Sequence, residues 1–369
     1  MPQPMTCLHN TETYSTTRRM TLDERNEMKE LNEIAWNVSE DEYRADPALS
    51  YSALSRFDRE GFDGLGKLFE RQDTPSLIFG SIVDALITGG MEEYERRFIV
   101  LQDFGISDTL RIIVRNLYDT YKDYYKELTD IPDQIVSEIA VNCGYYTDPK
   151  YYKVRVKKVK ECYPYYAVLK DAEGKTPISR QQYEDAMECV RILKTSPTTE
   201  RYFSDGTDTF KPYYQLKFKG EYNGIPLRCM ADLIWVDYDN KVIYPFDLKT
   251  SGHPEWEFHR SFLAWNYSIQ ARLYYELIRQ TIEKDDCFKD FTIADYQFIV
   301  ISNATRTPLV WEFKETKTDT LEVGEYYIPD WKKLAVELKE YLDERPRVPK
   351  GIFLDRPNDI AEHLKEILK

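Results

Sequence analysis

Three strand-like runs separated by two short turns lie between residues 213 and 249 of this 369-residue chain. Residues 213–219 alternate in polarity as a half-buried strand does, and a second run, 225–236, follows a Glu-Tyr-Asn-Gly turn. The third run, 241–249, follows a turn at 237–240. Because a short turn brings consecutive strands side by side and antiparallel, we expect these runs to pair as hairpins in one sheet.

The elements that follow favour an α/β fold. We expect a helix at 267–283, strands at 296–301 and 309–313, and a C-terminal helix from Trp331 that Asp330 caps. Strands and helices that alternate in this way form a sheet covered by helices. The predicted fold is therefore an α/β core with a central mixed β-sheet flanked by helices.

The first half of the chain is predicted to be mainly helical. Residues 50–69 and 76–89 are expected to be helical, and 107–142 is a tyrosine-rich helical stretch. A capping box at Ser179 and Gln182 opens a further helix that ends near residue 194. The expected organisation is an N-terminal extension at 1–48 with a helix at 22–36, a main domain at 49–345 made of a helical part (49–200) and a core (201–345), and a tail helix at 346–369.

Charge and composition argue against several classes of protein. The net charge of −14, from 50 basic and 64 acidic residues, opposes broad non-specific binding to polyanions, although it is compatible with a local basic channel. None of the six cysteines forms a CxxC pair and the four histidines lack metal-ligand spacing, which opposes a zinc ribbon or an iron–sulfur cluster. The sequence has no apolar stretch of the roughly 20 residues that a membrane helix needs and no apolar signal core, so we expect a cytoplasmic protein without a membrane partner.

A basic run at 153–160 reads Lys-Val-Arg-Val-Lys-Lys-Val-Lys. Its alternation predicts an exposed strand with Lys153, Arg155 and Lys157 on one face. Two interpretations of this face remain open. It is either a solvated edge strand that lysines protect from further pairing, or a contact with the phosphate backbone of DNA.

The third strand of the hairpins ends in Asp247, Leu248 and Lys249. Side chains alternate along a strand, so Asp247 and Lys249 share one face. Asp232 lies 15 residues earlier in the preceding strand, where pairing would bring it close to Asp247. Two carboxylates and the carbonyl oxygen of Leu248 are hard ligands that suit Mg²⁺. Lys249 could orient or deprotonate a water molecule, or neutralise the charge of a phosphoryl transition state.

The helix that follows adds two polar side chains on one face, because Gln270 and Tyr274 lie four residues apart. These side chains could hold a DNA phosphate or the attacking water. A surface ion pair is the alternative interpretation of Asp247 and Lys249. Pro245 indicates that the strand is locally an edge or a bulge, since proline cannot donate to a sheet ladder.

Two other strings in the chain are similar to the Asp-x-Lys pattern. The string at 329–332 is a literal Pro-Asp-x-Lys match, but its Asp330 is better placed as a helix N-cap. The string at 311–314 follows a strand, yet no helix with a Gln/Tyr pair comes after it. Only 247–249 combines an upstream Asp on a paired strand with a downstream helix.

An Asp on a hairpin strand, then Asp-x-Lys, then Gln-x-x-x-Tyr on a helix resembles the PD-(D/E)XK nuclease superfamily. Within it, the pattern is similar to the RecB-type and phage RecE-type (exonuclease VIII-like) exonucleases. Residues 79–100 look like the family's first motif helix and 170–197 like its middle helix, so the resemblance spans roughly residues 50–345. Asp84 stands where the family usually has a metal-binding His, and Gln215 stands where it often has a Glu.

The resemblance implies a PD-(D/E)XK core and a Mg²⁺-dependent exonuclease that hydrolyses linear double-stranded DNA, with Mn²⁺ as a substitute metal. It also implies a ring-like homo-oligomer, a single-strand annealing partner and a role in phage-type recombination or DNA processing in the host cytoplasm. An endonuclease of the same superfamily, or an inactive nuclease fold that binds DNA or a protein, remains open. The implied site consists of the metal ligands Asp84, Asp232, Asp247 and Leu248, of Lys249 to activate the water, and of Gln270 and Tyr274 to position the scissile phosphate.

Overall fold

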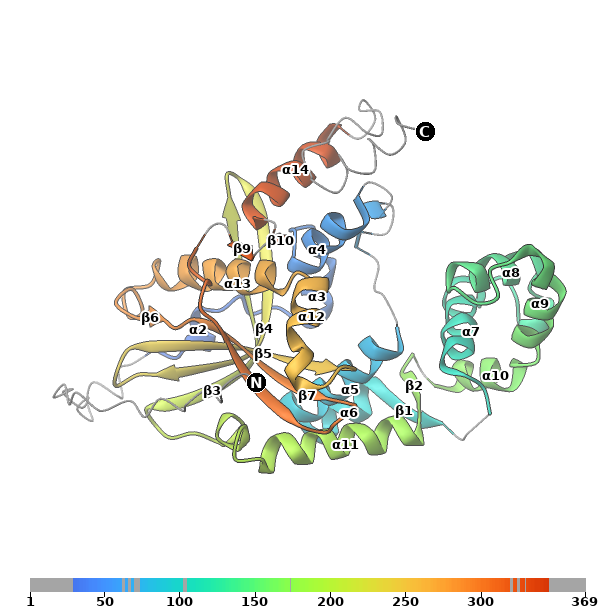
Figure 1. Cartoon of the computed structure of the whole chain (residues 1–369), viewed down its shortest axis with the longest axis horizontal. Helices are drawn as coiled ribbons and strands as arrows, with labels where there is room; N and C mark the ends of the chain where they lie inside the picture. The colour runs from blue at the N-terminus through green and yellow to red at the C-terminus, as the bar shows by residue number, and fades with distance from the viewer. Residues whose placement is uncertain are drawn as a thin grey trace, which may run out of the picture.

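The computed structural model describes residues 29–61, 64–65, 68–69, 74–101, 105–172, 174–318, 321–323, 326–328 and 330–344. Its centre is a six-stranded sheet with the order β3-β4-β5-β7-β8, in which β6 also pairs with β5 (Figure 1). The strands are β3 (Phe210–Tyr222), β4 (Ile225–Asp237), β5 (Val242–Ser251), β6 (Thr292–Ile293), β7 (Tyr296–Ser302) and β8 (Pro308–Phe313). β5 runs parallel to β6 and β7, and the other neighbours are antiparallel. The expected α/β fold with a central mixed sheet is confirmed.

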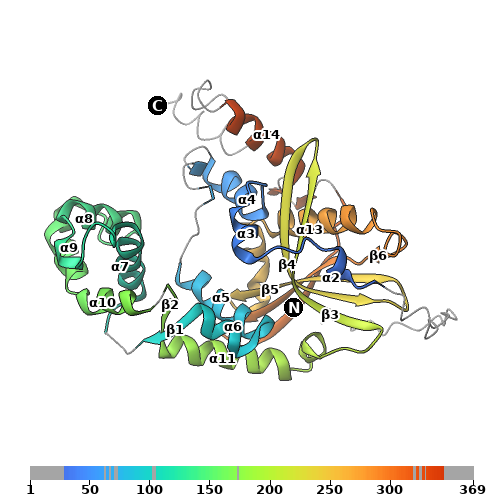
Figure 2. The same cartoon turned by 180° about the vertical axis from the view of Figure 1, so that it is seen from behind.

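Helices cover both faces of this sheet (Figures 1 and 2). One face packs against α4 (Tyr51–Glu60), α13 (Tyr267–Ile282) and α14 (Trp331–Glu344). The other packs against α5 (Pro75–Thr88) and α11 (Arg180–Thr195). Because each face has its own cover, alternate residues of a strand enter different clusters. In β7, Phe298 and Val300 pack on the α13 side, and Ile299 packs on the α5 side.

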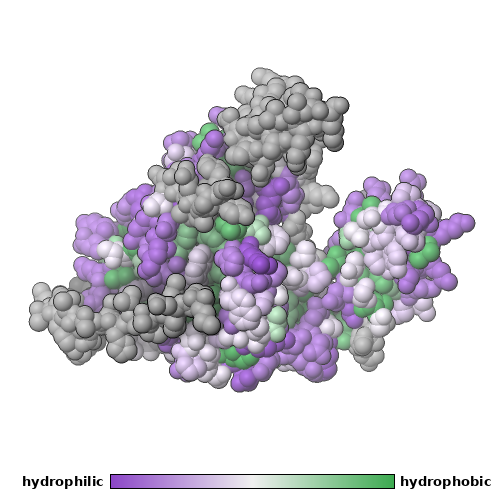
Figure 3. Space-filling model, in the orientation of Figure 1, coloured by the Kyte–Doolittle hydropathy of each residue, from purple (hydrophilic) through white to green (hydrophobic). Residues whose placement is uncertain are grey.

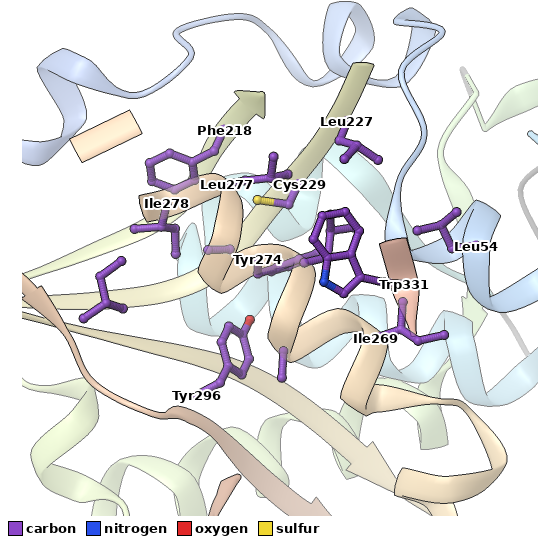
Figure 4. Packing of buried hydrophobic residues seen from close by; sticks show 14 of the residues in the cluster. Leu54, Phe218, Leu227, Cys229, Ile269, Tyr274, Leu277, Ile278, Tyr296 and Trp331 are labelled. Atoms are coloured by element: carbon purple, nitrogen blue, oxygen red, sulfur yellow. The ribbon is translucent and has the colours of Figure 1, made fainter. Parts of the chain in front are cut away.

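The α13 side holds the larger hydrophobic core (Figure 4). Tyr274, Leu277 and Ile278 of α13 pack there against Phe218 and Cys229 of the β3–β4 hairpin. The chain crosses from β5 to the parallel strand β7 through α12 (Phe258–Ala264) and α13, as a parallel connection requires. This crossover holds α13 directly against the strands that carry the acidic residues.

Residues 29–48, the described part of the expected N-terminal extension, pack along the edge strand β3. The backbone N–H of Trp36 donates to the Lys217 carbonyl at 2.8 Å, and Lys217 Nζ donates to the Val38 carbonyl at 2.8 Å. This cover protects an edge that could otherwise pair with another chain. The helix expected at 22–36 lies largely outside the described residues. Within residues 29–48 the structure has the short helices α2 (Leu31–Ile34) and α3 (Glu40–Ala45). The tail helix expected at 346–369 lies wholly outside the described residues.

Residues 105–172 form a helical lobe that stands apart from the sheet in both views (Figures 1 and 2). The lobe has its own hydrophobic core, which includes Ile113, Leu117, Val136, Val159 and Tyr166. At its base, β1 and β2 form a separate parallel pair. The elements of this region are α6 (Gly90–Arg97), β1 (Phe98–Leu101), α7 (Asp108–Tyr121), α8 (Asp133–Asn142), α9 (Tyr152–Lys160), α10 (Tyr163–Asp171) and β2 (Thr176–Ser179). Elsewhere in the chain, β9 (Leu321–Val323) and β10 (Tyr326–Ile328) form a small antiparallel hairpin before α14.

The prediction of a strand at 153–160 is wrong, because this segment is the helix α9. Arg155, Val156 and Val159 are buried at helical spacing against the lobe core. Lys153 and Lys157 are exposed and lie one helical turn apart, so the three basic residues do not share a face. The polar–apolar alternation at the start of the run is compatible with a strand and also with a helix that buries adjacent residues. The packing of the segment on the lobe core favours the helix.

Pro245 lies in a central strand and not at an edge of the sheet, since β5 has neighbours on both sides. The pairing on one side is nevertheless interrupted at this point. β6 pairs with β5 up to Ile243, and β7 pairs with it from Phe246 onward. The gap leaves room for a residue without a donor N–H.

Within the part of the chain that the structure describes, none of the helices combines the length and the apolar character needed to cross a membrane. The described cysteines form no disulfide.

Candidate active site

The acidic residues lie where two neighbouring strands separate. β4 and β5 pair from Asp237–Val242 to Leu233–Phe246, and no further. Beyond that point β4 stays with β3, while β5 continues beside β7 to Ser251. Asp232 and Asp247 are the next residues on the two strands, so the two carboxylates come close together at this fork. The site is thus built by a gap in the sheet that both layers of helices can reach.

Asp232 closes the fork on the β4 side. Its Oδ2 accepts a hydrogen bond of 2.9 Å from the backbone N–H of Leu248, which no longer has a partner on β4. Burial raises the pKa of Asp232 well above its usual range, and the nearby charges of Asp247 and Asp84 raise it further. Because the N–H and C=O of one residue point to the same side of a strand, the Leu248 carbonyl also faces this fork.

Asp247 is the most deeply buried member of the site, with 1% of its surface exposed. Lys249 Nζ lies 2.7 Å from its Oδ2, and Gln270 Nε2 of α13 donates to its Oδ1. Burial alone would lower the pKa of Lys249, but the charge of Asp247 outweighs it, and the net pKa lies above the usual value. The ammonium group also lies 4.6 Å from the centre of the Tyr267 ring. Lys249 is therefore a protonated, partly buried cation.

Gln270 and Tyr274 lie behind Asp247 and do not reach solvent. Gln270 is 3% exposed, and within the described residues its Oε1 has no hydrogen-bond partner. Tyr274 is 8% exposed in the α13-side core, with its ring 6.0 Å from that of Tyr296 (Figure 4). In this structure neither side chain is exposed toward a DNA phosphate, and the proposed contact of the two residues with the scissile phosphate stays a prediction. Gln270 acts on Asp247, and Tyr274 supports the helix that carries it.

Asp84 reaches the fork from the opposite helical layer. Gln215 Nε2 donates to its Oδ1 at 2.8 Å, and Arg97 Nη1 lies 3.7 Å from its Oδ2. Burial raises the pKa of Asp84 to about 6, against the lowering effect of Arg97 and with a further rise from Asp247. The helix approaches β5 closely at Gly80, where an added Cβ would lie 3.1 Å from Thr250 Oγ1. A larger residue there would push α5 away from the carboxylates.

Gln215 has a backbone conformation that is rare in a strand. Its φ is +53°, in the left-handed region that a non-glycine residue seldom adopts. Tyr214 packs on the α5 side of the sheet and Leu216 on the α13 side, although both would share a face in a regular strand. β4 switches faces in the same way at Asp232, which lies opposite. Such strained residues cluster at functional sites, and here the strain turns Gln215 toward Asp84.

The three carboxylates offer the oxygen ligands that divalent cations prefer, and their burial disfavours three unneutralised charges. The side chains are nevertheless engaged with each other, since Lys249 holds Asp247 and Gln215 holds Asp84. Across the described residues, no three Asp, Glu, His or Cys side chains are grouped as a ready-made metal site. A cavity of about 10 Å³ touches Asp232 and Asp247 and is otherwise mainly apolar, which is room for about one water molecule.

The sequence interpretation missed a group of residues that covers the Lys249 side of the site. The hydroxyls of Tyr51 and Ser55, on α4, both donate to the Trp265 carbonyl, at 2.6 and 2.9 Å. The guanidinium of Arg59 lies 4.7 Å from the centre of the exposed Trp265 ring. Tyr267, next to Lys249, completes this cover. The residues on α4 are about 200 positions away from Trp265 and Tyr267 in the chain, so no local sequence pattern could have connected the two groups.

The two similar strings have the ordinary roles that their context predicts. Asp330 Oδ1 accepts from the backbone N–H of Lys332 at 3.0 Å at the start of α14, as an N-cap does. Lys314 pairs with Glu312 at the exposed end of the edge strand β8. Neither lies at the fork.

Comparisons with known proteins give no assignment. No protein-family model matches the chain, and no curated protein sequence matches it. One similar solved structure is that of a protein from Eubacterium rectale described as a “putative exonuclease”. The two chains share 13% identity with a TM-score of 0.43, over 85% of this chain and 89% of the other. A likeness of this size shows neither a family nor an activity for this chain.

Proposed function

We propose that the protein is a metal-dependent deoxyribonuclease of the PD-(D/E)XK type that degrades linear double-stranded DNA from its ends. The fork carries the proposal: Asp232 and Asp247 lie close together where β4 and β5 separate, and Lys249 is paired with Asp247. Two carboxylates and a cation on adjacent strands suit the hydrolysis of a phosphodiester. The ordered resemblance in sequence supports the same reaction.

The ligand set fits Mg²⁺. Asp232, Asp247 and the Leu248 carbonyl would hold the ion, and Asp84 would add a ligand directly or through water. Mn²⁺ has similar ligand preferences and would substitute. When bound, the ion would polarise a phosphoryl oxygen and lower the pKa of an attached water. It would also relieve the repulsion that raises the pKa of Asp232.

The residues of the chain divide the remaining work. Lys249, whose Nζ lies 2.7 Å from Asp247 Oδ2, would activate the attacking water or offset the negative charge that develops on the phosphate. Gln270 holds Asp247 in one orientation through its amide N–H. Gln215 does the same for Asp84. These contacts pre-organise the carboxylates before substrate arrives.

A nuclease fold that binds DNA or a protein without cleavage is the second candidate. It is favoured by the absence of a ready-made group of three metal ligands in the described residues, and by Gln215 in place of an acidic residue. This candidate predicts DNA or partner binding without cleavage in any divalent metal. The proposed nuclease instead predicts cleavage that requires both a divalent metal and Lys249.

The test is cleavage of end-labelled linear duplex DNA with Mg²⁺ by wild type, Asp232→Asn, Asp247→Asn and Lys249→Ala. Each substitution should reduce the rate about a thousandfold or more, since each removes charge from the reacting centre. Asp330→Asn is the matched control, because it alters a similar string at a helix N-cap, and it should cleave normally. Cleavage by Asp247→Asn or Lys249→Ala at the wild-type rate would refute the assignment.

We further propose, from the family resemblance alone, a ring-like homo-oligomer that encloses DNA and passes a single strand to an annealing protein, in phage-type recombination in the cytoplasm. Light scattering of the purified protein tests the assembly. A mass that is a multiple of 43.8 kDa agrees with it. A monodisperse monomer at assay concentrations contradicts the ring.

A further inference from the structure

The helical lobe concentrates the exposed tyrosines of the part of the chain that the structure describes. The lobe has 11 of the 29 tyrosines. Among the described residues, every tyrosine that is prominently exposed lies in it, and three of the five fall in one short stretch, as Tyr146, Tyr151 and Tyr152. On the face of the lobe seen at the right of Figure 3, pale and strongly hydrophilic residues are mixed with scattered hydrophobic ones. We call Tyr146, Tyr151, Tyr152, Lys153 and Lys157 the tyrosine–lysine surface.

The aromatic part of this surface is held in place from beneath. Arg155 is 4% exposed, and its Nε and Nη2 donate to Ser137 Oγ at 3.0 and 2.7 Å. Its Nη1 donates to the carbonyl of Tyr146, which has a φ of +46°. The rings of Tyr146 and Tyr151 have centroids 5.3 Å apart. Rings fixed in this way lose little conformational freedom when a ligand binds.

The same surface is basic in a strongly acidic protein. α9 contains five Lys and Arg residues and no Asp or Glu, whereas the whole chain has a net charge of −14. Lys153 has no ion pair with any described residue, and Lys157 Nζ is 3.9 Å from its acidic neighbour Glu161. Both ammonium groups lie on the exposed side of α9, one turn apart. They can therefore contact an anion without breaking a strong ion pair.

We propose that the tyrosine–lysine surface binds single-stranded DNA, with bases stacked on Tyr151 and Tyr152 and phosphates against Lys153 and Lys157. Aromatic rings beside basic side chains are the usual means of holding a single strand without sequence preference. A duplex hides the faces of its bases, so exposed rings would add little to its binding. The proposal goes beyond the nuclease reaction, because binding here needs neither metal nor cleavage, and the two share only DNA as a ligand.

The experiment measures fluorescence anisotropy of a labelled oligothymidylate of about 20 nucleotides, long enough for one binding site, and of a duplex of equal length. EDTA is present throughout, so cleavage plays no part. The variants are Lys153→Glu/Lys157→Glu and Tyr151→Ala/Tyr152→Ala. The conservative variant Tyr151→Phe/Tyr152→Phe keeps the rings. The matched control Lys194→Glu/Lys284→Glu makes the same charge change at two exposed lysines outside the lobe.

Wild type should bind the single strand more tightly than the duplex. The lysine pair and the alanine pair should each weaken single-strand binding roughly tenfold or more, while the phenylalanine pair and the matched control stay within about twofold. Equal weakening by the control and the lysine pair would reduce the effect to net charge and overturn the proposal. So would wild type that does not bind the single strand, as expected if the surface serves a protein partner.

The two proposals can fail separately. Wild type that cleaves linear DNA in Mg²⁺ but binds the oligothymidylate equally well in all variants overturns only the lobe proposal. Wild type that binds through the lobe but cleaves nothing in any metal overturns only the nuclease proposal. Circular dichroism of each variant at the assay temperature identifies loss of fold, and the phenylalanine pair then still decides whether the rings are needed.

Discussion

The charges at the fork do not balance. Asp84, Asp232 and Asp247 lie near two cations, Lys249 and Arg97. In a buried site this excess of negative charge can be relieved by a proton or by a cation. The raised pKa values of Asp84 and Asp232 are the proton form of that relief. The imbalance should therefore be visible in the pH dependence of stability and in the response of the protein to metal.

The pH dependence of stability reports the ionisation of Asp84. Burial raises the pKa of Asp84 from 3.8 to about 6 in the folded protein, so its contribution to stability is fully present below about pH 4 and is lost as pH rises through 6. Asp84→Asn cannot ionise and lacks this loss. In EDTA, the melting temperature of the variant minus that of wild type should therefore increase as the pH rises from 4 to 6. Asp41→Asn, at an exposed site, should follow wild type, and parallel curves for Asp84→Asn would contradict the shift.

The melting temperature should also respond to divalent metal. Mg²⁺ or Mn²⁺ should raise the melting temperature of wild type, because an ion bound only by the folded state stabilises it by about 1.4 kcal/mol at ten times its dissociation constant. Asp232→Asn should lose most of this rise, and Asp330→Asn should keep it. Differential scanning fluorimetry with and without metal makes the comparison. An identical rise in Asp232→Asn would place the bound ion elsewhere.

At the scale of elements, the sequence predicted the strands of the fork better than the lobe. The turns before Ile225 and before Lys241 delimit β4 and β5, and α13 follows the expected bounds closely. These segments have strong local signals in the sequence: turn residues mark the ends of the two strands, and apolar residues at helical spacing mark α13. α9 does not, since the Lys-Val-Arg-Val pattern is compatible with both periods. Only the lobe core, which is assembled from four helices, decides that Arg155 points inward.

This difference between neighbours on α9 can be measured. Arg155→Met removes the donors to Ser137 Oγ and to the Tyr146 carbonyl, and should destabilise the lobe by about 2–4 kcal/mol. Lys153→Met, on the exposed side, should change stability by no more than about 0.5 kcal/mol. Hydrogen exchange of the α8 and α9 amides reports the lobe separately from the sheet. Equal protection in both variants would contradict the buried position of Arg155.

At the scale of the whole molecule, the fork depends on elements that sequence order does not bring together. The closeness of Asp232 and Asp247 could be inferred from one hairpin, although the two strands separate just before these residues. The approach of Asp84 from α5, and the cover by Tyr51 and Trp265, depend on how two helical layers pack on the sheet. Gln215 could be named from the resemblance, but its left-handed backbone and its contact with Asp84 could not. Long-range packing thus accounts for most of what was missed.

The measurement that tests the central claim most directly compares linear duplex DNA with covalently closed circular DNA. Each is incubated with wild type or with Lys249→Ala in Mg²⁺, Mn²⁺ or EDTA. The proposed exonuclease removes the linear DNA only, and does so only with metal and with Lys249 present. Loss of the closed circles would indicate an endonuclease. Intact linear DNA in both metals would contradict the nuclease and favour the binding module.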